Sequence, residues 1–147
     1  MTRFLTMLSV VLLLAGAPHA ALADGPVAQV EAFHKALQTG DREGALSRLS
    51  EKVQIFESGW VERSKAEYAA HHLNSDIAFS KVVKSETSDA TVIVEGALAF
   101  VTSQGTAKGT YEGKPVDTIN LETMGLQRVD GSWKIVHIHW SSRKVKY

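Results

Sequence analysis

Apolar residues follow a helical repeat in the first part of the chain. Val30, Phe33 and Leu37 recur three and four residues apart, the spacing that places side chains on one face of a helix. Gly40 ends this pattern, and Asp41 is placed to cap a second, short helix. The pattern therefore predicts two helices joined by a tight break.

A strand and a third helix are predicted next. Val53 to Glu57 alternates between apolar and polar residues, as a half-buried strand does. Ser64 and Glu67 have the spacing of a capping box, in which two side chains satisfy free N–H groups at a helix start. We expect this third helix to continue to about Asn74.

The second half of the chain has the pattern of strands. Runs rich in β-branched and aromatic residues alternate in polarity and are separated by turn-forming residues. We predict four strands, at residues 79–87, 91–102, 115–129 and 132–143. The connection at residues 103–114 contains three glycines, and we expect it to be a mobile hairpin tip. The predicted order is α-α-β-α-β-β-β-β, an α+β arrangement.

The last predicted strand carries two histidines two residues apart and is apolar on both faces. Side chains alternate between the faces of a strand, so its residues divide into two sets. One face is expected to carry Trp133, Ile135, His137 and His139, and the other Val136, Ile138 and Trp140. A strand covered on both sides suits the wall of a pocket or a subunit interface.

The N-terminus has the composition of a secretory signal peptide. Arg3 precedes an apolar run, from Phe4 to Ala15, that is too short to span a bilayer, and Ala21-Leu22-Ala23 offers small residues for cleavage. We expect residues 1–23 to be removed and residues 24–147 to form one domain that is periplasmic or secreted. No second long hydrophobic segment follows, so we expect no membrane association after cleavage.

Composition argues against several classes of function. The 16 basic and 16 acidic residues balance and form no run of like charge, so nucleic-acid binding is not predicted. The chain has no cysteine, which excludes disulfides, cysteine catalysis and cysteine metal ligands. We also predict no cofactor.

Two segments resemble the nuclear-transport-factor-2-like superfamily. The pattern Asp-Gly-x-Trp-Lys-Ile-Val-His-x-His at residues 130–139 is similar to the last hairpin of these proteins, and residues 30–56 are similar to their opening helices and first strand. The superfamily includes SnoaL-like cyclases, ketosteroid isomerases and the association domain of calmodulin-dependent kinase II. The resemblance implies a cone, in which a curved mixed sheet wraps the N-terminal helices and leaves a cavity at its wide end.

Glu57 and His72 are the candidates for catalysis. By the resemblance, Glu57 stands where ketosteroid isomerases keep a carboxylate base, and Tyr68 and His72 match pocket-lining helix positions. Glu57 and His72 could form an acid/base pair, or an ordinary hydrogen bond that only satisfies the histidine. Phe33 and Gly125 stand where the isomerases have their two hydrogen-bond donors. Without those donors steroid isomerisation is not expected.

The resemblance also assigns the pocket wall. In relatives the face that here bears Ile138 and Trp140 lines the pocket, whereas His137 and His139 would lie on the outer face, where relatives dimerise. The expected ligand-binding residues are Phe33, Glu57, Trp60, Tyr68, His72, Met124, Ile138 and Trp140. These aromatic residues would otherwise be plain core. Two histidines two residues apart could also bind a metal, but a position outside the pocket argues against it, and we predict no metal site.

Three functions remain open. The leading hypothesis is an exported, homodimeric domain that binds a small apolar ligand. The alternatives are a SnoaL-like isomerase, cyclase or dehydratase that uses Glu57 and His72 for proton transfer, and an assembly domain with a vestigial pocket. An enzyme predicts both residues at one cavity, a binder predicts a well-formed cavity without such a pair, and an assembly domain predicts a cavity filled by side chains.

Overall fold

The computed structural model describes residues 25–146, and the predicted signal peptide lies outside them. Within these residues the chain forms four helices and one six-stranded sheet. The helices are α1 (Pro26–Thr39), α2 (Arg42–Arg48), α3 (Lys65–His71) and α4 (Leu73–Val82). The strands are β1 (Leu49–Glu57), β2 (Trp60–Glu62), β3 (Val83–Glu95), β4 (Leu98–Tyr111), β5 (Lys114–Val129) and β6 (Ser132–Lys144). No helix of residues 25–146 is long and apolar enough to cross a membrane.

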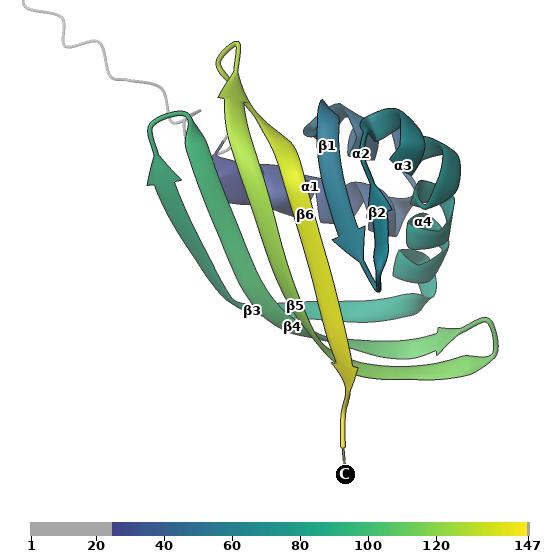
Figure 1. The fold of residues 1–147 in the computed structure, drawn as a ribbon. Coiled ribbons are helices and arrows are strands. Elements are labelled where there is room, and N and C mark those ends of the chain that lie inside the picture. The colour runs from purple at the N-terminus through teal and green to yellow at the C-terminus, as the bar shows by residue number, and fades with distance from the viewer. Residues whose placement is uncertain (1–24, 147) are drawn as a thin grey trace, which may run out of the picture.

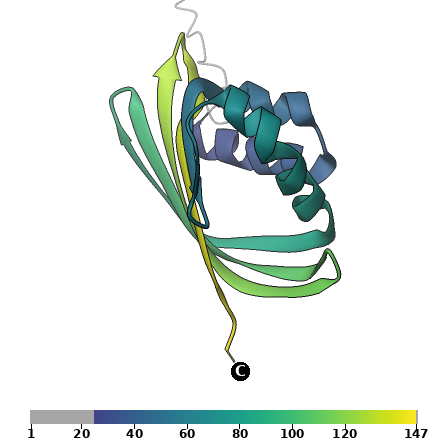
Figure 2. The same ribbon diagram turned by 45° about the vertical axis from the view of Figure 1, so that its right-hand side comes forward.

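The sheet is mixed and strongly curved. Its strand order is β2-β1-β6-β5-β4-β3, in which β1 and β6 are parallel and the other neighbours are antiparallel. The helices lie on its concave side, and the ends of β3, β4 and β5 curve beneath α4 (Figures 1 and 2). The predicted α+β fold is confirmed.

The predicted helix ends form as the capping rules require. Gly40 adopts the left-handed conformation, with φ of 75°, and ends α1. The Asp41 side chain accepts a hydrogen bond of 2.9 Å from the Gly44 N–H at the start of α2. Ser64 caps α3 by accepting a bond of 3.1 Å from the Glu67 N–H. The Glu67 carboxylate in turn accepts from the Arg63 N–H, one residue before the partner of a standard capping box.

The middle of the chain departs from the predicted elements. The third helix ends at His71, and a separate helix, α4, continues from Leu73 to Val82. Residues 79–82, predicted as strand, are therefore helical. The short strand β2 was not predicted, because three residues are too few to show an alternating pattern.

Two predictions for the strand region were wrong. The run at residues 91–102 contains a hairpin turn at Gly96, where φ is 58°. The predicted loop at residues 103–114 is mostly strand, because β4 continues to Tyr111 and only Glu112 and Gly113 form the turn. Glycines in a sequence pattern usually indicate a loop, whereas here they lie within a strand and permit it to bend.

The bend of the sheet depends on glycines in β4. A Cβ atom at Gly105 would lie 2.4 Å from the carbonyl oxygen of Glu86, and one at Gly109 would lie 2.7 Å from that of Val82. Both distances are too short for a side chain, so the close approach of these carbonyl groups to β4 requires glycine at these two positions. The resulting curvature forms the concave space beneath α4.

A β-bulge in β6 changes which residues face the core. Leu126 pairs with Ile135 and Gly125 pairs with His137, so Val136 is an extra residue without a partner on β5. Trp133 and Ile135 consequently point into the core, with exposed fractions of 7% and 0%. The prediction that they share the outer face with His137 and His139 was wrong, because strict alternation does not continue through a bulge.

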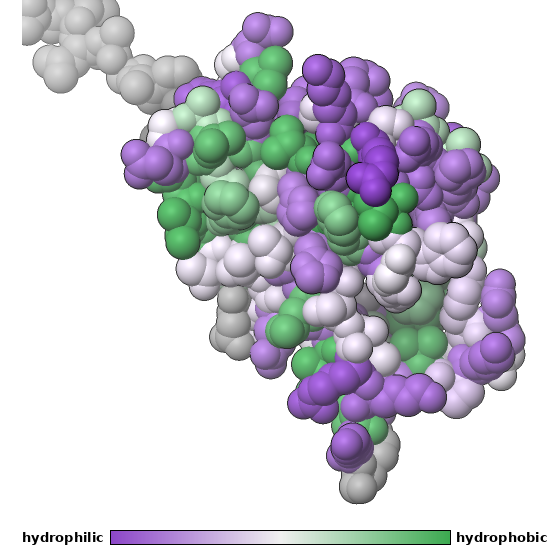
Figure 3. All heavy atoms as spheres, in the orientation of Figure 1, coloured by the Kyte–Doolittle hydropathy of each residue, from purple (hydrophilic) through white to green (hydrophobic). Residues whose placement is uncertain are grey.

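The outer face of the sheet exposes large apolar residues. Ile93, Leu98 and Phe100 have exposed fractions of 65%, 50% and 51%. Ile93 and Phe100 are paired across β3 and β4, and hydrophobic residues gather over that hairpin in Figure 3. On the same face, the Phe56 and His137 rings lie 5.4 Å apart. A monomer seldom exposes a continuous apolar patch of this kind.

Candidate functional site

A cavity of about 810 Å³ lies between the helices and the curved inner face of the sheet. Its walls come from α1, α4 and the ends of five strands, and the surface is hollowed there in Figure 3. The residues that contribute carboxyl or aromatic groups to its inner wall are Glu57, Asp76, Phe79, Glu122 and Trp140. This volume is within the range of small-molecule sites.

Glu57 stands on the cavity wall at the end of β1. The strand pairing places it beside Trp140 of β6, on the inner face of the sheet. Burial and, to a smaller extent, the charge of Asp76 raise the pKa of the Glu57 carboxyl from its ordinary value to about 7, against the opposing charge of His72. Near neutral pH this carboxyl can therefore both accept and return a proton.

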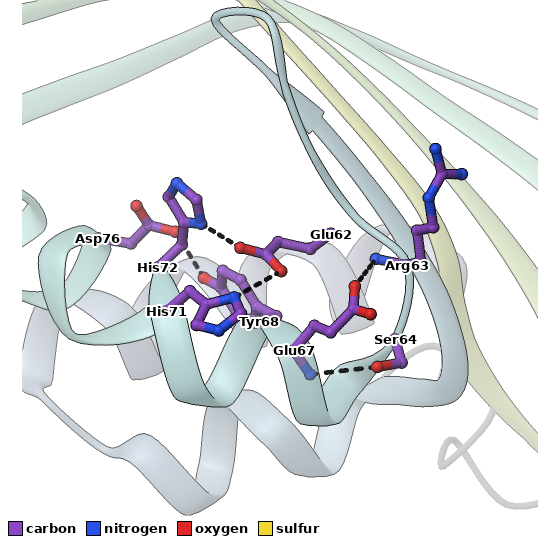
Figure 4. Close-up of polar contacts among 8 residues, drawn as sticks. All are labelled: Glu62, Arg63, Ser64, Glu67, Tyr68, His71, His72 and Asp76. Atoms are coloured by element: carbon purple, nitrogen blue, oxygen red, sulfur yellow. Dashed lines mark hydrogen bonds and ion pairs between the residues drawn. The ribbon is translucent and has the colours of Figure 1, made fainter.

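Asp76 is a second carboxyl on the same wall, and Tyr68 holds it in place. Tyr68 is buried on α3, and its hydroxyl donates a hydrogen bond of 2.7 Å to Asp76 Oδ2 on α4 (Figure 4). Burial raises the pKa of the Asp76 carboxyl, while the bond from Tyr68 and the charge of His72 oppose that rise. Burial, followed by the charge of Asp76, also raises the pKa of the Tyr68 phenol, so Tyr68 remains a donor.

A third carboxyl, that of Glu122, is fixed by two side chains. Trp140 Nε1 donates to Glu122 Oε2 over 2.6 Å, and His34 Nε2 donates to the same oxygen over 2.8 Å. The Trp140 ring also stacks on Phe33, with ring centres 6.3 Å apart and planes inclined by 18°. These contacts hold Trp140 as a fixed aromatic part of the wall.

His72 pairs with Glu62, not with Glu57. Its Nδ1 contacts Glu62 Oε1, while His71 Nδ1 lies 3.3 Å from Glu62 Oε2 (Figure 4). Glu62 is only 6% exposed and lies on β2, so this contact fastens the β1–β2 hairpin to α3. Glu57 and His72 share a much smaller cavity, of about 10 Å³, whose wall includes Trp60. The predicted Glu57–His72 hydrogen bond does not form.

The other predicted residues divide between the cavities and the core. Glu57 and Trp140 line the large cavity, and Trp60, Tyr68 and His72 line the small one with Glu57. Three of the predicted pocket residues are fully buried in the core and belong to neither wall: Phe33, Met124 and Ile138. Gly125 faces the outer side of the sheet, since a Cβ there would contact His137 and Phe100.

Asp76 and Glu122 were not among the predicted site residues, although the sequence holds a signal for each. Asp76 follows His72 and Tyr68 at intervals of four, which places all three on one helical face. Glu122 precedes Met124 by two, which places both on one face of a strand. His34 of α1 also reaches the cavity.

His137 and His139 lie on the outer face, as predicted. Burial, followed by the charge of His139, lowers the pKa of His137. Among residues 25–146, no group of three or more histidine, cysteine, aspartate or glutamate side chains is arranged to hold a metal ion.

Comparisons with known proteins agree with this architecture. The family model described as SnoaL-like domain matches residues 27–143. A candidate ketosteroid isomerase from Shewanella frigidimarina is 41% identical, with 77% of this chain and 91% of that chain covered and a TM-score of 0.75. No curated protein matches the chain.

Two more distant structures share the fold. A candidate dehydratase of the NTF2-like family from Streptomyces avermitilis is 22% identical, covers 80% of this chain and 92% of its own, and has a TM-score of 0.68. The CaMKII hub of S. rosetta is also 22% identical, covers 81% of this chain and 98% of its own, and has a TM-score of 0.69. At this identity the similarity shows the fold alone.

Proposed function

Because this chain belongs to the SnoaL-like domain family, whose scaffold hosts more than one activity, we propose that it binds a small organic molecule and that Glu57 transfers a proton on that molecule. One observation carries the proposal: a carboxyl with a pKa of about 7 stands on the wall of a cavity of about 810 Å³. A base with a pKa near the working pH is the group that proton transfer requires.

Asp76 supplies the second group for this chemistry. Removing a proton from a carbon or hydroxyl leaves negative charge on the molecule, and that charge needs a hydrogen-bond donor. Burial raises the pKa of the Asp76 carboxyl, which favours the protonated form that can donate such a bond. In this mechanism Glu57 accepts the proton, Asp76 stabilises the charge, and Tyr68 positions Asp76 through its hydrogen bond.

The reaction class is isomerisation or dehydration. Isomerisation moves a proton from one atom of the substrate to another, and dehydration removes a proton from carbon and releases the hydroxyl group as water once it is protonated; neither needs an oxidant or a reductant. The names of two similar structures, a candidate ketosteroid isomerase and a candidate dehydratase, favour this class. Steroid isomerisation itself is not proposed, since the buried Phe33 and the outward-facing Gly125 supply no donor to the cavity.

A direct test measures hydrogen exchange on small ketones. In D₂O a carboxylate base exchanges protons on the carbon beside a carbonyl, and ¹H NMR detects the loss of signal. We expect the protein to accelerate this exchange and Glu57→Gln to abolish the acceleration. The control is Glu31→Gln, which changes an exposed glutamate on α1. Equal acceleration by the Glu57 variant would contradict the proposal.

The titration of Glu57 can be measured without any substrate. ¹³C NMR of the side-chain carboxyl should give a pKa near 7, as burial requires. Titration near 4.5, the ordinary value of a glutamate, would remove the basis of the mechanism. If ligands bind but no exchange occurs, the protein is a binder without catalysis.

We also propose that two copies associate through the outer face and that the domain is exported. Exposed Ile93, Leu98 and Phe100 support association, and one structure with the same fold is a CaMKII hub.

The short apolar run before Ala23 supports export. Mass analysis of protein from cells should find residues 1–23 removed, and intact Met1 in the membrane fraction would contradict export.

A further inference from the structure

The inner face of the sheet changes character along its strands. Beyond the core, it carries small side chains with hydroxyl or amide groups. The strand pairing arranges them in two rows across the sheet, Thr87–Gly105–Asn120–Ser142 and Ser85–Ala107–Thr118–Lys144. All of these except Ala107 line the large cavity. These two rows therefore offer many hydrogen-bonding groups and little apolar surface.

Most of these groups are available to a ligand. Among the residues that the structure describes, the hydroxyls of Ser85, Thr87 and Ser142 make no hydrogen bond to protein. Thr118 Oγ1 donates to Asn120 Oδ1 over 2.8 Å, which leaves the Asn120 amide nitrogen as a donor toward the cavity. A ligand group that lies here must replace water at several donors and acceptors, so it needs hydroxyls of its own.

Beside the carboxyls the cavity presents a ring-sized apolar surface, that of Trp140. Trp140 is fixed by Phe33 and Glu122, whereas Phe79, which packs edge-on against Tyr111, lies beyond the two rows. A fixed aromatic face binds flat rings at little entropic cost. The cavity thus has a fixed aromatic face near Glu57 and hydroxyl-lined rows further along the strands.

The charge of the wall opposes anions. Three carboxyl residues lie on the inner wall of the cavity, Glu57, Asp76 and Glu122, whereas Lys144 is the only lysine or arginine among the described residues that line it. Glu86 and Asp117 alternate with the inward residues and pair with Lys84, over 2.8 Å, and Lys108, over 3.9 Å, instead. Within residues 25–146, Glu57, Asp76 and Glu122 have no lysine or arginine partner, although Glu122 pairs with His34, so a carboxylate or phosphate on the ligand would meet repulsion at the reactive end.

We infer that the ligand of this cavity is an uncharged molecule that joins a flat ring to a part rich in hydroxyl groups. The inference rests on the proposed function, because a cation beside Glu57 would stabilise its ionised form and remove the condition for proton transfer. It differs from the small apolar ligand that the sequence suggests, because the packed aromatic residues of that prediction lie in the core.

Four matched probes test this inference by isothermal titration calorimetry. They are phenyl β-D-glucopyranoside, its glucuronide with one added carboxylate, its 2-amino-2-deoxy analogue with an added ammonium, and phenyl cyclohexyl ether without the sugar hydroxyls. We expect the glucoside to bind, and each of the other three to bind about ten-fold more weakly. Titration of both the native protein and Glu57→Gln separates binding from proton transfer, because binding should persist in the variant even if the catalytic proposal fails.

Two threonine variants locate the hydroxyl-binding end. Thr87→Val removes one hydroxyl from the cavity and should weaken glucoside binding about five-fold while sparing the ether. Thr102→Val is the matched control, since Thr102 lies on β4 next to Ser103 but on the outer face. The inference is overturned if the glucoside does not bind at about 10 mM, if any other probe binds as tightly, or if Thr87→Val changes nothing.

Discussion

The two ends of β4 and β5 have the same backbone arrangement and opposite roles. At one end the inward side chains of Ala99, Val101, Met124 and Leu126 are buried to 2% exposure or less and form the core. At the other end, inward positions hold Ser103, Gly105, Thr118 and Asn120, which line the cavity. Side chains alternate between the two faces of the sheet along the whole length of these paired strands. Side-chain size and polarity therefore decide whether one strand supports the fold or a site.

The largest effect should follow a substitution that leaves a cavity in the core at the buried end of the sheet. Ile138 is fully buried on the inner face of β6, so Ile138→Ala should lower the free energy of unfolding by about 2–5 kcal/mol. His139→Ala, one residue along on the outer face, is the control and should change it by less than about 1 kcal/mol. Urea denaturation measures both. Similar losses for the two variants would mean that the faces of β6 are assigned wrongly.

A smaller loss of stability is expected from a substitution at the cavity end of the sheet, where the strands bend. Gly105→Ala places a methyl group 2.4 Å from the Glu86 carbonyl oxygen, so β3 must move away from β4. We expect a loss of about 1–3 kcal/mol from this crowding, together with faster amide hydrogen exchange in β3. Ser103→Ala adds no bulk two residues earlier on the same face, and it should leave both measurements nearly unchanged. Normal exchange in the Gly105 variant would show that the bend does not need glycine.

Stability should depend on pH through Glu57. The folded-state pKa, about 7, lies above the ordinary 4.5, so the folded protein holds a proton that the unfolded chain releases. The contribution of this group is complete below pH 4.5 and is lost as pH rises through 7. After allowance for partial exposure, the loss is about 1–2 kcal/mol. Glu57→Gln should therefore be more stable than the native protein at pH 8 and equal to it at pH 4. Identical pH profiles would contradict the assignment.

Local signals in the sequence were enough for α1, α2 and the start of α3, but not for α4. The Gly40 and Asp41 break and the Ser64 cap depend on neighbouring residues, and each forms as predicted. The resemblance supplied the expectation of a curved sheet around the helices. The bulge at Val136 and the bend at Gly105 depend instead on how distant strands pair, and a strand pattern read alone contains no information on its partners.

The same limit applies to the candidate site. Glu57 and Trp140 were predicted because the resemblance places both on the pocket wall. The partners of His72 and Trp140 are Glu62 and Glu122, which come from other elements, and only the folded structure brings them together. Asp76 was within reach of prediction, since it shares a helical face with Tyr68.

The smallest expected effect concerns the outer face of the sheet, which the described helices do not cover. We expect the mature protein to be a dimer by light scattering, because Ile93 and Phe100 would otherwise remain exposed.

His137 and His139 lie on this face, and burial and the neighbouring histidine lower the pKa of His137. Acidification is therefore needed to protonate His137, and a charge gained at a covered face costs on the order of 1 kcal/mol. The dimer dissociation constant should then rise about five-fold, and His137→Gln should remove most of that rise. His71→Gln, on α3, should leave the pH dependence intact. A monomer at micromolar concentration would exclude this interface, and a dimer insensitive to pH would place the histidines outside it.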